Sequence, residues 1–160
     1  MRYLGIAVLL LSVLFLCYEY KKKCAQTRAE LFDFLDFLKY MRLRISCFME
    51  DKRRLGRGFC AKSELGALFV SEIEKCDGPC GAYRRVRDRL SFSENAKALL
   101  DEIFSSCEIG YLDEVLGALD SGISRFFALL REEEKQVFER CRVNCCILVT
   151  LALGIALILC

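Results

Sequence analysis

The sequence contains no histidine among its 160 residues, so the commonest general base and metal ligand of proteins is missing. Catalysis would have to use carboxylates, lysines or cysteines instead. A phosphate-binding loop is not indicated either, because Gly56-Arg57-Gly58 is a single G-x-G without the strand that such loops require. The paired carboxylates Asp33 and Asp36 are expected on a polar, solvated helix face. We therefore predict no enzymatic activity, no catalytic residue and no cofactor.

Proline is nearly absent, with one residue in the chain, and threonine and valine are few in its middle part. Leucine, phenylalanine, glutamate, lysine and arginine are frequent there. This mixture favours helices and disfavours strands. The sequence therefore predicts an all-α fold.

Charged side chains are absent from both ends of the chain. No lysine, arginine, aspartate or glutamate lies between Tyr3 and Tyr18 or from Val143 to Cys160. Helices of this length span about 24 to 27 Å, close to the ~30 Å hydrocarbon core of a bilayer. A helix buried inside a protein core is the alternative. We predict transmembrane helices over 3–19 and 144–160, which flank an antiparallel helical bundle over 20–143.

Basic residues flank both apolar ends on the side of the bundle. The residues expected at the membrane interface are Lys21, Lys22, Lys23, Arg140 and Arg142 on this side and Arg2 before the first apolar end. By the positive-inside rule, the central domain is predicted to be cytoplasmic and both termini to lie across the membrane. A cleaved signal peptide is disfavoured, because the lysines follow the first apolar stretch instead of preceding it.

The eleven cysteines have no regular spacing, which fits a reducing compartment better than a disulfide framework. The only metal-like spacing is Cys76-Asp77-Gly78-Pro79-Cys80. A structural zinc site usually needs a second cysteine pair or histidines. We interpret this segment as a turn with two small thiols and predict no metal ion, with Cys76 and Cys80 as weak metal-ligand candidates.

Apolar residues recur every three or four positions between the two apolar ends, as in amphipathic helices. The first such helix is predicted over 31–48, the second over 63–75 and a short third over 83–90. Ser91 and Glu94 have the S-x-x-E spacing of a capping box that opens the fourth. The last helix begins near Leu112 and meets no breaker before the second apolar end, so we predict one long helix.

Some aromatic and charged residues are candidates for partner contacts. Two phenylalanines lie at or beyond the margin of the first amphipathic helix's apolar face, which suggests contacts outside the bundle. The clustered arginines lack any nucleic-acid motif, so lipid headgroups or acidic partners suit them better than nucleic acid. The glutamate run is expected to be mainly solvated. The candidates are Phe32, Phe37, Arg84, Arg85, Glu132, Glu133 and Glu134.

The last sixty residues follow a recognisable order in the run LLDEIFSSCEIGYLDEVLGALDSGISRFFALLREEEKQVFERCRVNCCILVTLALGIALIL. A helix, a glycine-bearing break, a long helix with an acidic patch, a basic step and an apolar end succeed one another. Gly5 and the abrupt basic exit of the first apolar end fit the same arrangement. The layout of the whole chain resembles the stage III sporulation protein AB family of endospore-forming bacteria.

The resemblance implies a non-enzymatic assembly or platform component of the channel complex that links mother cell and forespore. It would lie in the mother-cell membrane around the forespore and be required for sporulation, and its cytoplasmic part would be similar to platform proteins of type II secretion. Candidate partners are the other membrane proteins of that complex, a secretion-type ATPase, the lipid bilayer and a further copy of the chain. The alternative is a small membrane-tethered regulator whose Cys76–Cys80 turn responds to redox state or metal.

Overall fold

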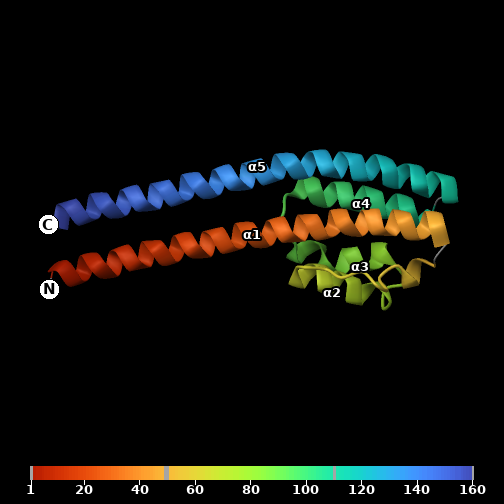
Figure 1. The fold of residues 1–160 in the computed structure, drawn as a ribbon, viewed down its shortest axis with the longest axis horizontal. Coiled ribbons are helices and arrows are strands. Elements are labelled where there is room, and N and C mark those ends of the chain that lie inside the picture. The colour runs from red at the N-terminus through yellow and green to blue at the C-terminus, as the bar shows by residue number, and fades with distance from the viewer. Residues whose placement is uncertain (1, 49–50, 110, 160) are drawn as a thin grey trace. The chain divides into compact units, whose positions relative to one another are not determined.

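Helices account for most of the residues that the computed structural model describes, which are 2–48, 51–109 and 111–159 (Figure 1). The elements are α1 (Arg2–Phe48), η1 (Lys52–Arg54), α2 (Glu64–Ile73), α3 (Pro79–Val86), η2 (Arg87–Arg89), α4 (Glu94–Ile109) and α5 (Leu112–Leu159). No strand occurs in these ranges. The predicted all-α fold is confirmed.

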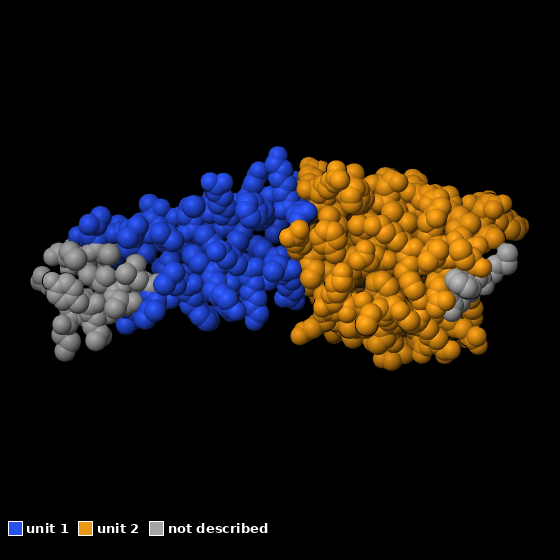
Figure 2. Space-filling model, in the orientation of Figure 1, with its two compact units in different colours: residues 1–26, 134–160 blue, residues 27–133 orange. Residues whose placement is uncertain are grey.

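Two compact units divide the chain, and Figure 2 colours them separately. The bundle unit consists of residues 27–133, and the two-helix unit consists of residues 1–26 and 134–160. Residues 27–48 of α1 and 112–133 of α5 belong to the bundle unit, together with the shorter helices. The remaining halves of α1 and α5 form the two-helix unit.

Long helices carry both chain ends. α5 is a single helix of 48 residues, as the lack of a breaker predicted. α1 is likewise continuous over 47 residues, so the first apolar end and the first amphipathic segment form one helix. Within the described ranges, no helix combines the length and the apolar character that a membrane crossing requires.

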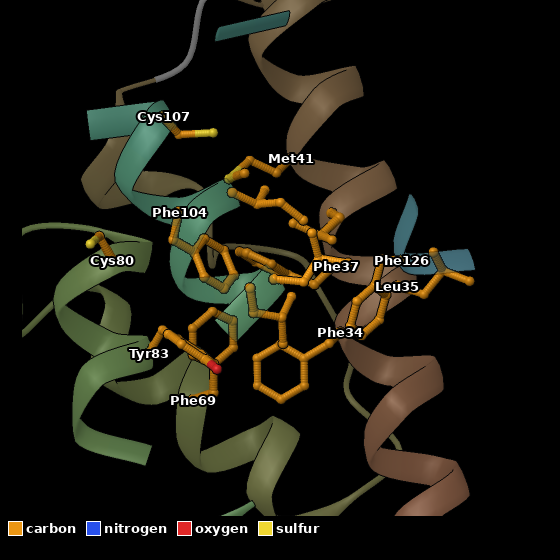
Figure 3. Close-up of a cluster of buried hydrophobic side chains, with 14 of the residues drawn as sticks. Phe34, Leu35, Phe37, Met41, Phe69, Cys80, Tyr83, Phe104, Cys107 and Phe126 are labelled. Atoms are coloured by element: carbon orange, nitrogen blue, oxygen red, sulfur yellow. The ribbon is translucent and has the colours of Figure 1, made fainter. Parts of the chain in front are cut away.

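Aromatic side chains form the centre of the bundle unit (Figure 3). Phe37 packs edge-on against Phe69 with ring centroids 4.9 Å apart, and Phe34 lies 5.0 Å from the same ring. Tyr83 and Phe104 approach to 5.1 Å. Edge-to-face and tilted pairs at these separations add to the stabilisation that burial itself provides.

The placement of Phe37 corrects a prediction. Its side chain is only 1% exposed, so it belongs to the core and not to the outer margin of α1. Phe34 and Leu38 on the same helix are equally buried, because α1 is covered on more than one side within the bundle unit. The apolar face of the helix is therefore wider than a single stripe would be.

Asp33 is buried and holds the start of α2, so the prediction that it is solvated is wrong. Its carboxylate accepts hydrogen bonds from the backbone amides of Lys62 and Ser63, at 3.0 and 2.6 Å, and from the Ser63 hydroxyl at 2.6 Å. Ser63 in turn accepts a bond from the Gly66 amide at 3.0 Å and caps α2. Asp36 stays partly exposed, 3.8 Å from the Lys62 ammonium.

Glu30 plays a similar part at the entrance to α4. Its side chain is fully buried and accepts a hydrogen bond from the Ser91 amide at 3.1 Å. The helix is capped two residues later, where the Ala96 amide donates to the Ser93 hydroxyl at 3.2 Å. The predicted capping box of Ser91 and Glu94 is therefore wrong, because Ser93 takes the capping position and Glu94 begins the helix.

Candidate functional site

The two-helix unit exposes large apolar side chains along both of its helices. Leu11, Leu14 and Phe15 on α1 are each more than 60% exposed, and Leu151 and Leu153 on α5 are more than half exposed. A contiguous apolar surface of this kind marks contact with a protein partner or with lipid.

The most buried of the described side chains in the same unit are small. Ala152 is 3% exposed and Cys141 9%, whereas Cys17 and Cys145 are half-buried. The Asn144 side-chain amide donates to the Tyr20 hydroxyl at 3.1 Å and fixes the register between the two antiparallel helices. Small buried side chains together with exposed large apolar ones, as seen among the described side chains, are typical of helices that associate in lipid.

Basic side chains follow the apolar stretch of α1 and precede that of α5. Lys21, Lys22 and Lys23 on α1 are exposed, and so are Arg140 and Arg142 on α5. Arg2 begins α1, but its side chain lies outside the part of the chain that the structure describes. The Lys and Arg side chains nearest the Tyr20–Asn144 contact thus come from both helices.

Thiols line the seam between the two helices. The Cys24 thiol of α1 lies close to the Cys141 thiol of α5, and Cys145 is also close to Cys141. Cys17 and Cys145 form a further contact of this type. Burial, followed by the neighbouring Cys24 thiol, raises the pKa of Cys141 to about 11.

Sequence analysis missed this thiol seam, although a signal was present. Cys17 and Cys24 are seven residues apart, and Cys141 and Cys145 are four residues apart, so each pair lies on one helix face. These cysteines form no C-x-x-C pattern, and their spacing becomes informative only when two helices face each other.

The candidate arginines of α3 are paired with the protein's own carboxylates. Arg85 donates to Glu72 at 2.8 Å, and the Arg84 guanidinium lies 3.9 Å from Glu108. The pKa of Glu72 is lowered by its hydrogen bonds, first from Lys75 and then from Arg85. Both arginines remain exposed, but they offer a partner a largely neutralised surface instead of a strongly positive one.

The other partner candidates lie on the long helices. Phe32 is partly buried against the core, with the Arg28 guanidinium 5.6 Å from its ring centre. Glu132 is exposed, whereas Glu133 and Glu134 are half-buried. Each of these residues keeps part of its surface exposed, in contrast to Phe37.

The Cys76–Cys80 segment forms a tight turn, as predicted. Asp77 and Gly78 have φ angles of 59° and 137°, a region that favours glycine and tolerates aspartate. Cys76 lies 3.9 Å from a Glu72 carboxylate oxygen, and Cys80 is buried at the start of α3. Burial, and then the charge of Glu108, raises the pKa of the Cys80 thiol.

A small cavity lies beside this turn in the bundle unit. It measures about 30 Å³ and is lined in part by Met41, Cys80, Phe104 and Cys107, which Figure 3 labels. Such a volume holds about one water molecule and excludes an organic cofactor. Within the described residues, no group of three or more Cys, Asp or Glu side chains is arranged to hold a metal ion.

No family model, no curated protein and no solved structure matches this chain.

Proposed function

We propose that the protein is a non-enzymatic assembly component anchored in a membrane by the two apolar ends of its chain. The observation that carries the proposal is the inverted packing of the two-helix unit, in which Ala152 and Cys141 face inward and Leu14 and Leu153 face outward. Water would oppose such an arrangement, whereas lipid would solvate the outer side chains.

The absence of charged residues from both ends of the sequence supports the same proposal. Residues 3–18 and 143–160 contain no lysine, arginine, aspartate or glutamate, and the exposed basic residues stand immediately beside them. In this arrangement the bundle unit is cytoplasmic and both termini lie on the opposite side of the membrane. The bundle unit, with its paired surface charges, then serves as a docking body for neighbouring membrane proteins.

The complex that the protein serves is proposed from its resemblance to the stage III sporulation protein AB family. That resemblance points to the channel between mother cell and forespore, with the protein in the mother-cell membrane around the forespore. Partners would be the other membrane proteins of the channel, a secretion-type ATPase and a further copy of the chain. The layout of the last sixty residues is what supports this step.

A labelling experiment tests the membrane placement. Two full-length variants retain one cysteine each, Cys60 in the bundle unit, which is exposed, or Cys160 at the end of the chain. In intact cells that express the protein in the outer cytoplasmic membrane without sporulating, a membrane-impermeant maleimide should label Cys160 and leave Cys60 unlabelled until the membrane is permeabilised. Labelling of both thiols in intact cells, or of neither, would overturn the proposed topology.

Gene deletion tests the proposed complex separately. In the source organism, cells without the gene should complete engulfment and then fail to mature the forespore, so that heat-resistant spores are lost. The wild-type gene supplied elsewhere should restore them. Normal spore counts in the deletion strain would refute the sporulation role while leaving the membrane topology to the labelling result.

The alternative regulator function at the Cys76–Cys80 turn has less support. A raised pKa keeps the Cys80 thiol protonated at neutral pH, which makes it a poor nucleophile and a poor metal ligand. Stoichiometric zinc in the purified protein, lost on changing Cys76 and Cys80 to serine, would reverse this preference.

A further inference from the structure

We propose that Cys24 and Cys141 form a redox clasp, a thiol pair that a small-molecule disulfide of the glutathione class oxidises to a disulfide between α1 and α5. The clasp lies within the two-helix unit and joins two residues that are far apart in the sequence. It does not depend on the proposed membrane role.

The first argument is the contact between the two side chains. Both cysteines are free thiols, and their side chains meet across the seam. The Tyr20–Asn144 hydrogen bond gives independent evidence, because in an antiparallel pair with this register residue 24 lies opposite residue 140, one position from Cys141. Facing positions on helices packed ~8–10 Å apart bring Cα atoms to about 3.5–5.5 Å, and a neighbouring position lies slightly farther away. A disulfide requires about 4.4–6.8 Å between Cα atoms, so the backbone can accept one.

The second argument is the charge around this pair. Cys24 directly follows three exposed lysines, Lys21 to Lys23, and Cys141 stands between the exposed Arg140 and Arg142. Glutathione disulfide carries a net negative charge, so these lysine and arginine side chains attract it. The second thiol pair, Cys17 and Cys145, has fewer basic neighbours, because Lys21 lies near Cys17 and apolar residues such as Leu16 and Ile147 flank the pair.

The reaction balances as two successive thiol–disulfide exchanges. The half-buried Cys24 attacks first as the thiolate: a bond forms between its Sγ and one glutathione sulfur, and the second glutathione leaves as a thiolate that takes up a proton. Cys141 Sγ then attacks the Cys24 sulfur, forms the interhelical disulfide and displaces the first glutathione. The two cysteines lose two electrons in total, which the glutathione disulfide gains.

The raised pKa of Cys141 sets the order of these steps. A thiol that holds its proton above neutral pH attacks slowly from solution, but its contact with Cys24 places it next to the mixed disulfide. Closure should therefore be slower than the first exchange and should speed up as the pH rises toward 11.

Two built-in cleavage sites make the clasp easy to detect. Methionines occur only at 1, 41 and 49, so cyanogen bromide separates residues 2–41 from residues 50–160. The full-length reduced protein in detergent is treated with glutathione disulfide, and free thiols are then blocked. After cleavage, the two fragments should migrate together without reductant and separately with it. Trypsin should release the peptide of residues 24–28 joined by a disulfide to the peptide of residues 141–142. Mass spectrometry identifies this linked pair.

Matched double variants decide between the two thiol contacts. In Cys24→Ala/Cys141→Ala the fragments should separate without reductant, whereas Cys17→Ala/Cys145→Ala should retain the wild-type joined fraction. Circular dichroism checks that both variants keep the helical content of the parent. The proposal is overturned if the fragments of the wild type never join, if Cys24 carries glutathione without closing, or if joining follows Cys17 and Cys145 instead.

Discussion

The bundle unit buries its large apolar side chains, whereas the two-helix unit exposes many of its own. In the bundle unit, Phe34, Phe37 and Phe69 are each about 1% exposed. Among the described side chains of the two-helix unit, Cys141 and Ala152 are the buried ones, whereas Leu14 and Leu157 are mostly exposed. The same two helices, α1 and α5, contribute to both units. The two units therefore do not differ in secondary structure. They differ in whether the large apolar side chains on these helices are buried or exposed.

This difference shows how each unit obtains its stability. The bundle unit excludes water from an aromatic core and satisfies its buried carboxylates with backbone amides. Among the described side chains of the two-helix unit, the large apolar ones are half-buried or exposed, so this pair of helices does not enclose them by itself. Substitutions should consequently act in opposite ways in the two units.

The largest effect is expected from removing an aromatic ring from the bundle core. Phe37→Ala leaves a cavity beside Phe69 and Phe59 and should lower the free energy of unfolding by about 3–5 kcal/mol. Phe138→Ala, in the two-helix unit, changes a side chain that is 69% exposed and should cost less than ~0.5 kcal/mol. Urea unfolding in detergent, followed by circular dichroism and by maleimide labelling of the buried Cys107, measures both.

Equal losses for the two phenylalanines would break the comparison. In that case Phe138 would have a buried environment in the protein as it exists in solution. The inverted packing of the two-helix unit would then no longer support membrane anchoring.

A smaller effect is expected from the buried carboxylate that anchors α2. Asp33→Asn keeps the size of the side chain but replaces an acceptor oxygen with a donor opposite three N–H and O–H groups. The free energy of unfolding should fall by about 1–3 kcal/mol. Asp36→Asn is the matched control, because the Asp36 carboxylate is partly exposed and its ion pair with Lys62 is long, at 3.8 Å. This substitution should lower the free energy of unfolding by less than ~0.5 kcal/mol. A control that costs as much as Asp33→Asn would refute the anchoring role.

Asp33 and Asp36 illustrate which features of the fold the sequence can predict and which it cannot. The all-α class, the N-terminus of α2 at Ser63 and the unbroken α5 followed from composition, capping residues and the absence of breakers. The burial of Asp33 did not follow, because one charged residue in an amphipathic pattern is assigned to the polar face by default. Only the loop before α2, thirty residues further along the chain, supplies the donors that make its burial favourable.

Phe37 and the thiol seam were missed for a related reason. Periodicity gives one apolar face per helix, but α1 is covered on several sides within the bundle unit, so Phe37 is enclosed as well. The thiols of Cys24 and Cys141 meet only because α1 and α5 are paired in an antiparallel register. Such contacts depend on tertiary pairing, which local patterns do not encode.

Alkaline pH should reveal the buried thiol of the two-helix unit. The pKa of Cys141 in the folded protein is about 11, above the ordinary value of 9.0, because burial and then Cys24 and Cys145 disfavour its thiolate. The unfolded chain therefore loses this proton first, and the stability that depends on it is complete below pH 9 and is lost as the pH rises to 11. Unfolding midpoints should drop across this window by less in Cys141→Ser than in the parent. An identical drop in both proteins would mean that the Cys141 thiol is not held in a protonated state.

The smallest effect is expected from the exposed ion pairs of the bundle unit. Arg42 on α1 makes a two-pronged contact with Asp120 on α5, and this contact raises the pKa of Arg42. Both side chains are about half exposed, so water and salt screen their attraction, and the net gain of such pairs is small. Asp120→Asn should shift the unfolding midpoint slightly at low ionic strength and not measurably in high salt, and the exchanged pair Arg42→Asp/Asp120→Arg should recover the low-salt value. A loss as large as that of Asp33→Asn would show that the bundle unit depends on its surface charges, and that its stability does not come from the buried core alone.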